Sequence, residues 1–280
     1  MPWLPYPIVD AHVHLFPDRL FGAIRDWFRQ HGRPAYYEQP TPELIHFLEE
    51  QGVGRFFVLN YAHKPDISRG LNRWNHEFAR RHPQAVCFGA IHAADESPLE
   101  VAEEALVEYG LAGFKLHLQV QGFSADDERL LPVYERVMEL DKLLIFHAGT
   151  AAPDAACVGV RHFARLMRRY PKLKALVAHL GAYECDRFLD LGEEYPSLWF
   201  DTAFTFVRGG KGFAVNVPLE RVATLQDRLL FGSDFPNIAF SFEDAITGFL
   251  DLQLGEQFYR RVCAENAARF LSGGIATGSP

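Results

Sequence analysis

The chain has 280 residues, of which 48% are hydrophobic and 23% are charged, an ordinary composition for a globular protein. Its formal net charge is -8 at pH 7, which argues against nucleic acid and anionic membranes as partners. The length suits one α/β barrel, and nothing in the sequence forces a division, so we expect a single domain over residues 1–280.

Short apolar runs, rich in Val, Ile, Leu and Phe, recur along the chain and have the length of strands. They cover residues 7–12, 55–60, 85–91, 111–117, 142–148, 173–180, 198–203 and 228–234. Helical patterns lie between them, with caps or apolar residues at helical spacing, over residues 97–110, 124–140, 182–195 and 256–271. Inside one of these helices, Pro132 predicts a kink or two shorter helices.

The alternation of apolar strands with helices predicts a parallel sheet covered by those helices. Eight strand–helix units in a chain of this size predict an α/β fold, a (β/α)8 TIM barrel with its helices outside. An open doubly wound sheet is the alternative. It is disfavoured because no glycine-rich phosphate loop follows the first strand.

The cysteines stand far apart, at positions 87, 157, 185 and 263, and form no Cys-x-x-Cys pair. This spacing predicts reduced thiols in a cytoplasmic protein. The N-terminus lacks a signal-peptide pattern, and no apolar run approaches the roughly 18–20 residues that span a bilayer. We expect a small-molecule substrate as the partner, and the sequence leaves monomer and homo-oligomer open.

Polar side chains stand at the carboxyl ends of the predicted strands, which in a barrel meet at one mouth. The first strand carries His12 and His14, the fifth carries His147 and the eighth carries Asp234. Residues two apart share a strand face, with Cα atoms about 6.6–6.8 Å apart. Neutral imidazole is a common ligand of divalent transition metals. These four residues therefore predict a metal site, although a single histidine can also be a hydrogen-bonded core residue.

Two further aspartates belong to the same strand ends. We expect Asp10 to orient a ligand or a backbone group rather than to coordinate the ion. For Asp201, in "LWFDTAF", we expect a structural hydrogen bond, with a substrate contact as the alternative.

Lys115 lies inside the fourth predicted strand, in "GFKLHLQ", and faces the barrel interior together with His117. An unpaired buried lysine is costly, so Lys115 either anchors an anionic substrate group, is carboxylated between two metals, or pairs with an acidic residue. We expect the first role, with His63 or His92 at the rim. His117 is either a second substrate contact or a core histidine.

Six motifs in this order, "VDAHVHLF", "GFKLHLQVQGF", "LLIFHAGT", "LVAHLG", "LLFGSDFP" and "ENAARFL", resemble the amidohydrolase superfamily. More narrowly, they resemble the amidohydrolase-related metal-dependent hydrolases, the branch that includes aminocarboxymuconate semialdehyde decarboxylase-like enzymes. The resemblance covers nearly the whole chain. It implies a TIM barrel with a divalent metal, commonly zinc, at its mouth.

The resemblance also implies roles. His12, His14 and His147 match metal ligands, and Asp234 matches the eighth-strand aspartate, which is ligand and proton acceptor. His179 matches the sixth-strand histidine, which binds metal in some members and contacts water and substrate in the decarboxylase-like branch. Lys115 occupies the position of a carboxylated lysine in binuclear members, but "GFKLH" resembles the branch without a second metal. We therefore expect one ion rather than two, zinc or alternatively manganese.

The resulting prediction is a metal-dependent hydrolase that activates water to cleave a C–O or C–N bond of a small, carboxylate-bearing ester, lactone or amide. Asp234 and His179 are its predicted catalytic residues. The alternatives are a metal-dependent non-oxidative decarboxylase of an unsaturated or aromatic carboxylic acid, and a barrel that binds a ligand without turnover. The chain lacks a long insertion to build an aromatic-acid pocket, which favours the hydrolase.

Overall fold

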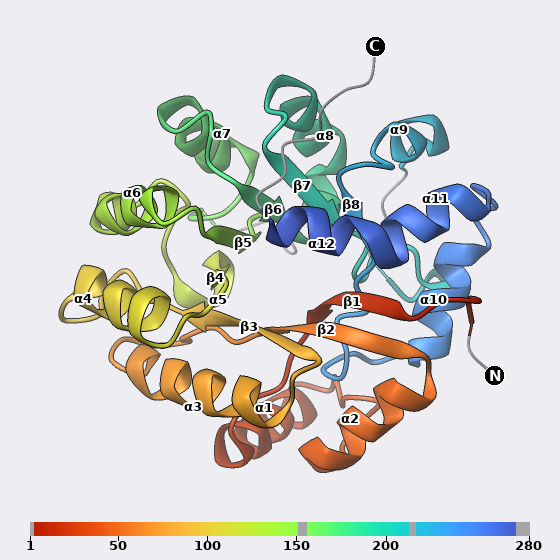
Figure 1. Cartoon of the computed structure of the whole chain (residues 1–280), viewed down its shortest axis with the longest axis horizontal. Helices are drawn as coiled ribbons and strands as arrows, with labels where there is room; N and C mark the ends of the chain where they lie inside the picture. Colours follow the sequence, from red (N-terminus) through yellow and green to blue (C-terminus); the bar gives the residue numbers. More distant parts are fainter. Residues whose placement is uncertain (1–2, 151–155, 213–216, 273–280) are drawn as a thin grey trace.

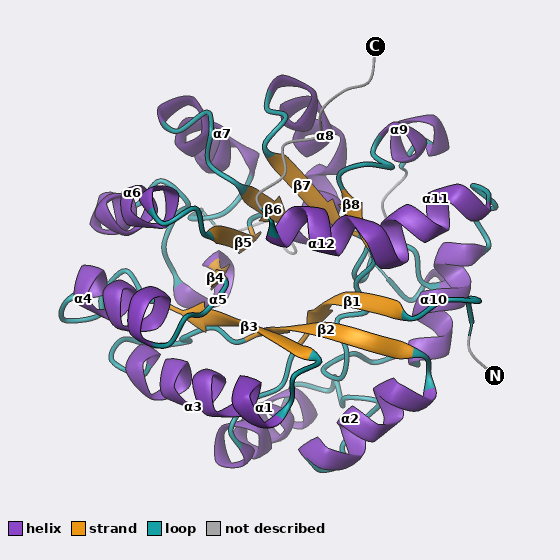
Figure 2. Cartoon of the chain, viewed as in Figure 1, coloured by secondary structure: helices purple, strands orange, loops and turns teal. Residues whose placement is uncertain are grey.

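The computed structural model describes residues 3–150, 156–212 and 217–272. Its eight strands form one parallel sheet in the order β1 to β8, with the helices arranged around it (Figure 1 and Figure 2). This is a nearly closed TIM barrel, and the predicted fold is confirmed.

Each predicted strand range overlaps one observed strand. The strands are β1 (Ile8–Val13), β2 (Val53–Leu59), β3 (Ala85–Ala90), β4 (Gly113–His117), β5 (Leu143–His147), β6 (Ala175–Val177), β7 (Leu198–Asp201) and β8 (Leu229–Leu230). The α-helices are α1 (Asp18–Gln30), α2 (Thr41–Glu50), α3 (Ser68–Arg81), α4 (Pro98–Glu103), α5 (Leu118–Gln121), α6 (Leu131–Glu139), α7 (Val160–Arg169), α8 (Cys185–Glu194), α9 (Leu219–Thr224), α10 (Phe242–Leu250), α11 (Glu256–Arg260) and α12 (Asn266–Leu271). The 3-10 and π-helical turns are η1 (Glu104–Glu108), η2 (Glu128–Leu130), η3 (Ala178–Glu184), η4 (Arg208–Gly210) and η5 (Arg261–Glu265).

The helices predicted over residues 97–110, 124–140 and 256–271 are each divided into shorter segments in the structure. Pro132 lies in the first turn of α6, where a missing N–H costs no hydrogen bond, so the helix begins there instead of kinking. In the last helix, the π-turn η5 separates α11 from α12. The carbonyl of Val262 in this turn accepts the N–H of Phe231, 3.1 Å away, directly after β8.

The barrel closes where β1 meets the segment after β8. Three backbone hydrogen bonds form this seam: Ala11 N–H to Phe231 O (2.8 Å), Asp234 N–H to His12 O (2.9 Å) and His14 N–H to Phe235 O (2.7 Å). The register of β1 against β2 also shifts between Asp10 and Val13. The seam places the first and last motifs of the sequence side by side.

The end of the barrel at which the strands begin is filled by apolar side chains. Helix α12 lies across this end (Figure 1), and its Phe270 ring packs against Phe57 and Trp199, with centroids 6.4 and 5.5 Å away. Polar groups of the interior therefore gather toward the other end, where the strands stop.

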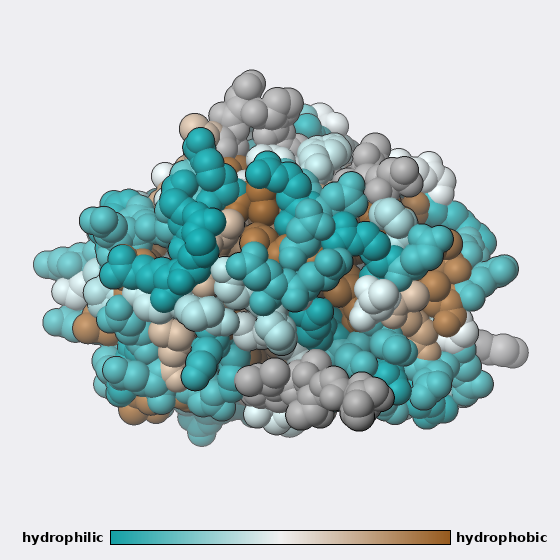
Figure 3. Space-filling model, turned by 90° about the horizontal axis from the view of Figure 1, so that it is seen from above, coloured by the Kyte–Doolittle hydropathy of each residue, from teal (hydrophilic) through white to brown (hydrophobic). Residues whose placement is uncertain are grey.

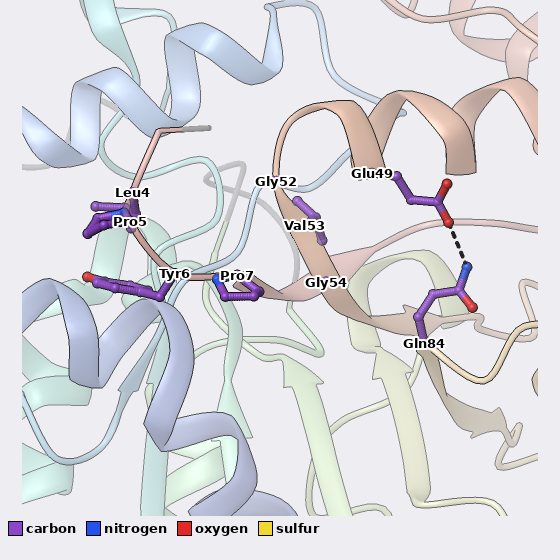
Figure 4. A pocket seen from close by; sticks show the side chains of 9 residues that line it. All are labelled: Leu4, Pro5, Tyr6, Pro7, Glu49, Gly52, Val53, Gly54 and Gln84. Atoms are coloured by element: carbon purple, nitrogen blue, oxygen red, sulfur yellow. Dashed lines mark hydrogen bonds between the residues drawn. The ribbon is translucent and has the colours of Figure 1, made fainter. Parts of the chain in front are cut away.

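A shallow cavity of about 620 Å³ lies outside this filled end, where β1 and β2 begin. Figure 4 shows its lining, Leu4, Pro5, Tyr6, Pro7, Glu49, Gly52, Val53, Gly54 and Gln84. Gln84 donates to the Glu49 carboxylate across 3.1 Å. This lining contains no histidine, cysteine or lysine among the described residues, so it offers no cluster of metal ligands.

The outer surface in Figure 3 is mostly hydrophilic, with scattered hydrophobic patches. None of the helices that the structure describes has the length and hydropathy to cross a membrane. All four cysteines are free, as predicted from their spacing.

Candidate metal centre

The carboxyl ends of the strands bring together a compact polar cluster in the barrel interior. It consists of His12 and His14 from the end of β1, Lys115 from β4, His147 from β5, His179 after β6 and Asp234 after β8. The lysine and the four histidines are buried, and the Asp234 side chain is only 16% exposed. The structure thus places all the predicted metal ligands, both predicted catalytic residues and Lys115 at one site.

Short distances join the members of this cluster. Asp234 Oδ1 lies 3.2 Å from His12 Nε2 and 3.0 Å from His14 Nε2, and these two nitrogens are 3.1 Å apart. Lys115 Nζ lies 3.2 Å from His12 Nε2. On the other side, His147 Nδ1 is 3.1 Å from His179 Nε2. Ligand atoms of His12, His179 and Asp234 all lie within 4.8 Å of one another, so these three residues could hold one ion.

Hydrogen bonds behind the rings determine which nitrogen faces the centre. The Nδ1 atoms of His14 and His179 meet backbone carbonyls, which can only accept, at Leu59 O (2.9 Å) and Ala203 O (2.8 Å), and Nδ1 of His12 meets the carboxylate oxygen Oδ2 of Asp201 (2.8 Å). Each Nδ1 therefore carries the proton, and each Nε2 presents a lone pair toward the cluster.

A divalent cation fits this donor set. Several imidazole lone pairs and a carboxylate oxygen face one another at about 3 Å, which is unfavourable unless a positive charge lies between them. Imidazole with carboxylate is a ligand combination that suits zinc and related transition metals. Burial lowers the pKa of His12 and His147 well below 6.5 and that of His179 to about 4, so the rings are neutral and able to coordinate at pH 7.

The backbone at these strand ends is shaped by glycine and by unusual dihedral angles. A Cβ on Gly149 would overlap the carbonyl oxygen of Gly181, and one on Gly232 would lie 2.8 Å from the Cβ of His12. His179 and Asp234 have φ values of 58° and 66°, a region that non-glycine residues rarely occupy. Backbone strain of this kind concentrates at functional sites.

The sequence profile of the family Amidohydrolase matches residues 9–273. The chain belongs to the amidohydrolase family. The predicted resemblance is therefore confirmed, and the protein is an enzyme of the amidohydrolase superfamily.

Solved structures share the barrel at low sequence identity. An uncharacterized TIM-barrel protein from Bordetella bronchiseptica is 20% identical, with a TM-score of 0.75 over 95% of this chain and 99% of that one. A 2,6-dihydroxybenzoate decarboxylase from Rhizobium is 18% identical, with a TM-score of 0.67 over the same shares. A 5-carboxyvanillate decarboxylase from Novosphingobium aromaticivorans, solved with manganese, is 13% identical, with a TM-score of 0.67 over 96% and 97%. No curated protein matches the sequence.

Asp10 of this amidohydrolase supports the site from behind the ligands. Its Oδ1 accepts the backbone N–H groups of His12 and Ser233, both at 3.0 Å, and its Oδ2 accepts the Ser233 hydroxyl at 2.5 Å. Burial raises the pKa of Asp10 to about 7. The carboxylate thus ties β1 to the segment after β8, which agrees with the predicted role in orienting backbone groups. The sequence analysis did not single out Ser233, although it stands beside Asp234 in "FGSDFP".

Asp201 has a larger role than the structural bond expected for it. Besides its bond to the His12 ring, it accepts the N–H groups of His179 and Ala203 through Oδ1, at 2.8 and 3.1 Å. Burial raises its pKa to about 7. One carboxylate therefore orients the ring of His12 and the backbone of His179.

The structure places one of the predicted substrate-binding residues in the cluster and two outside it. Lys115 is fully buried in the cluster, where burial lowers its pKa to about 8. His63 is exposed in the loop after β2. His92 is buried in the turn after β3, where its Nδ1 accepts the N–H of Ala94 at 3.0 Å. Neither His63 nor His92 contacts the cluster within the described part of the chain, and their place at the rim stays a prediction.

Aromatic rings stack at the mouth of this amidohydrolase, and one of them, Tyr61, was not singled out by the sequence analysis. Tyr61 follows β2 and lies against His14 and His117, with ring centroids 5.8 and 4.9 Å away. His117 in turn stacks on His147, with centroids 4.0 Å apart and planes at 13°. The position of Tyr61 just beyond a strand end, in "VLNYAH", was a signal that could have identified it.

Proposed function

We propose that this amidohydrolase is a metal-dependent hydrolase that uses water to cleave the C–O or C–N bond of an ester, lactone or amide. Its proposed substrate is a small molecule that bears a carboxylate. The observation that supports this proposal is the convergence of His12, His179 and Asp234 within 4.8 Å at the mouth of the barrel. The four free cysteines support a reducing, cytoplasmic location.

The proposed ligands are His12, His14, His147 and Asp234, holding one ion of zinc or manganese. The group of ligand atoms within 4.8 Å contains His12 and Asp234 of this set, together with His179, which is proposed to contact water instead. When bound, such an ion supplies a Lewis acid that acidifies water and polarises a carbonyl oxygen.

Asp234 is the proposed proton carrier. Its contacts with His12 and His14 both use Oδ1, and Oδ2 has no hydrogen bond with the described residues. Oδ2 can therefore take a proton from water and later deliver it to the leaving oxygen or nitrogen.

His179 and Lys115 complete the proposed site. His179 is held by Asp201 and Ala203, and its Nε2 lone pair is proposed to accept a hydrogen bond from the attacking water, leaving polarisation of the substrate carbonyl to the ion. Lys115 is the proposed anchor for an anionic substrate group, with His63 and His92 proposed at the rim.

Metal analysis of the purified protein, followed by a substrate panel, tests the proposal. We expect about one zinc or manganese ion per chain, loss of turnover on chelation, and recovery on adding the ion back. Release of acid from esters, lactones or amides supports the hydrolase. A folded protein that binds neither ion, or one that binds metal and turns over none of these substrates, contradicts it.

A second candidate is non-oxidative decarboxylation of an unsaturated or aromatic acid at the same centre. Two decarboxylases share the fold over nearly the whole chain, which supports keeping this reaction in the panel. In that reaction Asp234 would protonate the carbon that loses the carboxylate. Carbon dioxide release from aromatic acids, without acid release from esters, would replace the hydrolase by this candidate.

A further inference from the structure

The histidines at the ends of β4 and β5 form a pair that the proposed metal chemistry does not fully use. His117 and His147 are register partners in adjacent strands. Their rings stack at 4.0 Å with planes only 13° apart. His147 is 8% exposed, and its Nδ1 is directed toward His179. The pair therefore lies directly beside the candidate metal centre.

Each ring of this pair keeps one buried nitrogen without a hydrogen-bond partner among the described residues. These atoms are His117 Nδ1 and His147 Nε2. An unmet buried polar atom costs about 1–3 kcal/mol, so a group that satisfies two such atoms at one place gains affinity. If His147 uses Nδ1 toward an ion, its Nε2 carries the proton and becomes a donor.

The surroundings fix the pair in place. The side chain of Gln121 accepts the backbone N–H of His117 at 2.7 Å and donates to the carbonyls of Ala62 and Ile91, at 3.0 and 2.7 Å. The Tyr61 ring also lies against His117, with ring centroids 4.9 Å apart. The unmet nitrogens thus belong to rings that are held by neighbours and are ready to receive a ligand.

We propose that His117 Nδ1 and His147 Nε2, together with the proposed anchor Lys115, complete the subsite that binds the carboxylate of the substrate. A carboxylate offers two oxygens, and because the ring centroids are 4.0 Å apart we infer that one such group bridges the two nitrogens. His117 is then a substrate-binding residue, where the sequence had left a substrate contact and a core histidine as equal alternatives. This inference rests on the proposed carboxylate-bearing substrate.

Binding of benzoate to the metal-loaded protein, measured by calorimetry, tests the subsite. His117→Phe keeps the stacked ring but removes the nitrogen, and it should weaken benzoate binding about tenfold. His117→Gln, which keeps a polar atom, should recover part of the affinity. Benzamide, which has no charge, should bind wild type and His117→Phe equally. The exposed His46→Phe is the matched control and should bind benzoate as the wild type does, whereas His63→Phe tests the proposed rim.

Several results would overturn the subsite. Equal benzoate affinity in wild type and His117→Phe would mean that the ion or Lys115 alone holds the carboxylate, and a loss in His63→Phe instead would move the site to the rim. If His117→Phe does not fold, His117→Leu provides the same comparison. In the wild type, benzoate should shift the ¹⁵N resonance of His117 Nδ1, and an unchanged resonance refutes the contact in any case.

The outcome is separable from that of the proposed function. Metal content and turnover of esters, lactones or amides test the hydrolase, whereas benzoate affinity and the ¹⁵N shift test the subsite. A decarboxylase with an intact carboxylate subsite would retain the second set of results and lose the first.

Discussion

The two ends of the barrel are built from the same strands and differ in almost every chemical respect. Where the strands begin, apolar rings such as Phe57 and Phe270 fill the interior, and the cavity outside is lined by proline, glycine and a few polar residues. Where they end, imidazoles, a lysine and carboxylates are buried together. Residues with positive φ, His179 and Asp234, also lie there. One end of the fold supplies stability, and the other uses that stability to hold costly polar groups in place.

The strongest test of this contrast is removal of the proposed proton carrier, Asp234, at the mouth of the barrel. Asp234→Asn should lower turnover about 10³-fold, because an amide cannot accept the proton of water. Steady-state kinetics with the substrate found in the panel measures the loss, and circular dichroism checks the fold. Turnover within tenfold of the wild type would show that another group carries the proton.

Asp201→Asn tests a residue that orients the proposed ligand His12 without being a proposed ligand itself. The amide nitrogen cannot accept the Nδ1 proton of His12, so the ring loses its preferred tautomer, and metal affinity should fall about 10–100-fold. Chelator competition measures this change. The exposed Asp190→Asn, whose carboxylate pairs with Arg221 on the surface, is the control and should leave the affinity unchanged.

Asp10→Asn should change the stability of the mouth of the barrel, because Asp10 holds the backbone there. The amide can no longer accept all the hydrogen bonds from His12 and Ser233, which should lower the free energy of unfolding by about 2 kcal/mol. Urea unfolding of the metal-loaded protein gives the value. An unchanged midpoint would show that the closing seam does not depend on this carboxylate.

The pH dependence of metal affinity tests whether the charge of Lys115 opposes binding of a cation. Its pKa of about 8 means that the charged ammonium opposes a cation below that pH and is lost above it. Affinity for manganese should therefore rise with pH, by at most about tenfold per unit, and level off above pH 8. In Lys115→Met this rise should disappear. The same slope in wild type and variant would assign the proton to a different group.

The smallest effect is expected at the opposite end. Gln84→Ala removes the bond to Glu49 across the cavity in Figure 4 and should change stability by less than about 0.5 kcal/mol, with turnover unaltered. Thermal unfolding and kinetics report on both. A large loss of activity would give this end a function that its residues do not suggest.

The sequence predicts the barrel and most of the centre because both follow from short-range patterns. Apolar runs mark the strands, and polar residues such as His147 mark their carboxyl ends. The remaining features of the centre depend on contacts between residues that are far apart in the sequence. That Asp201 bonds the ring of His12 depends on closure of the barrel, and that Tyr61 lies against His117 depends on how two loops fold. Neither of these two contacts produces a periodic pattern of residues in the sequence.

The positions of His63 and His92 show the same limit of prediction from the sequence. His63 and His92 follow strands as His14 and His147 do, yet the structure leaves the first exposed and engages the second in its own turn. The direction of a loop after its strand is set by local hydrogen bonds, here those of His92 with Ala94 and Asp95, which a strand pattern does not encode.

The seam between β1 and the segment after β8 makes the ligand set a property of the finished barrel. His12 and His14 belong to the first strand and Asp234 to the last, and Asp10 and Ser233 fasten the two. A half-formed barrel holds either the first pair or the final carboxylate, but never all three. If the proposed ligands bind an ion, they can do so only after the barrel has closed, so metal occupancy would report the completion of folding.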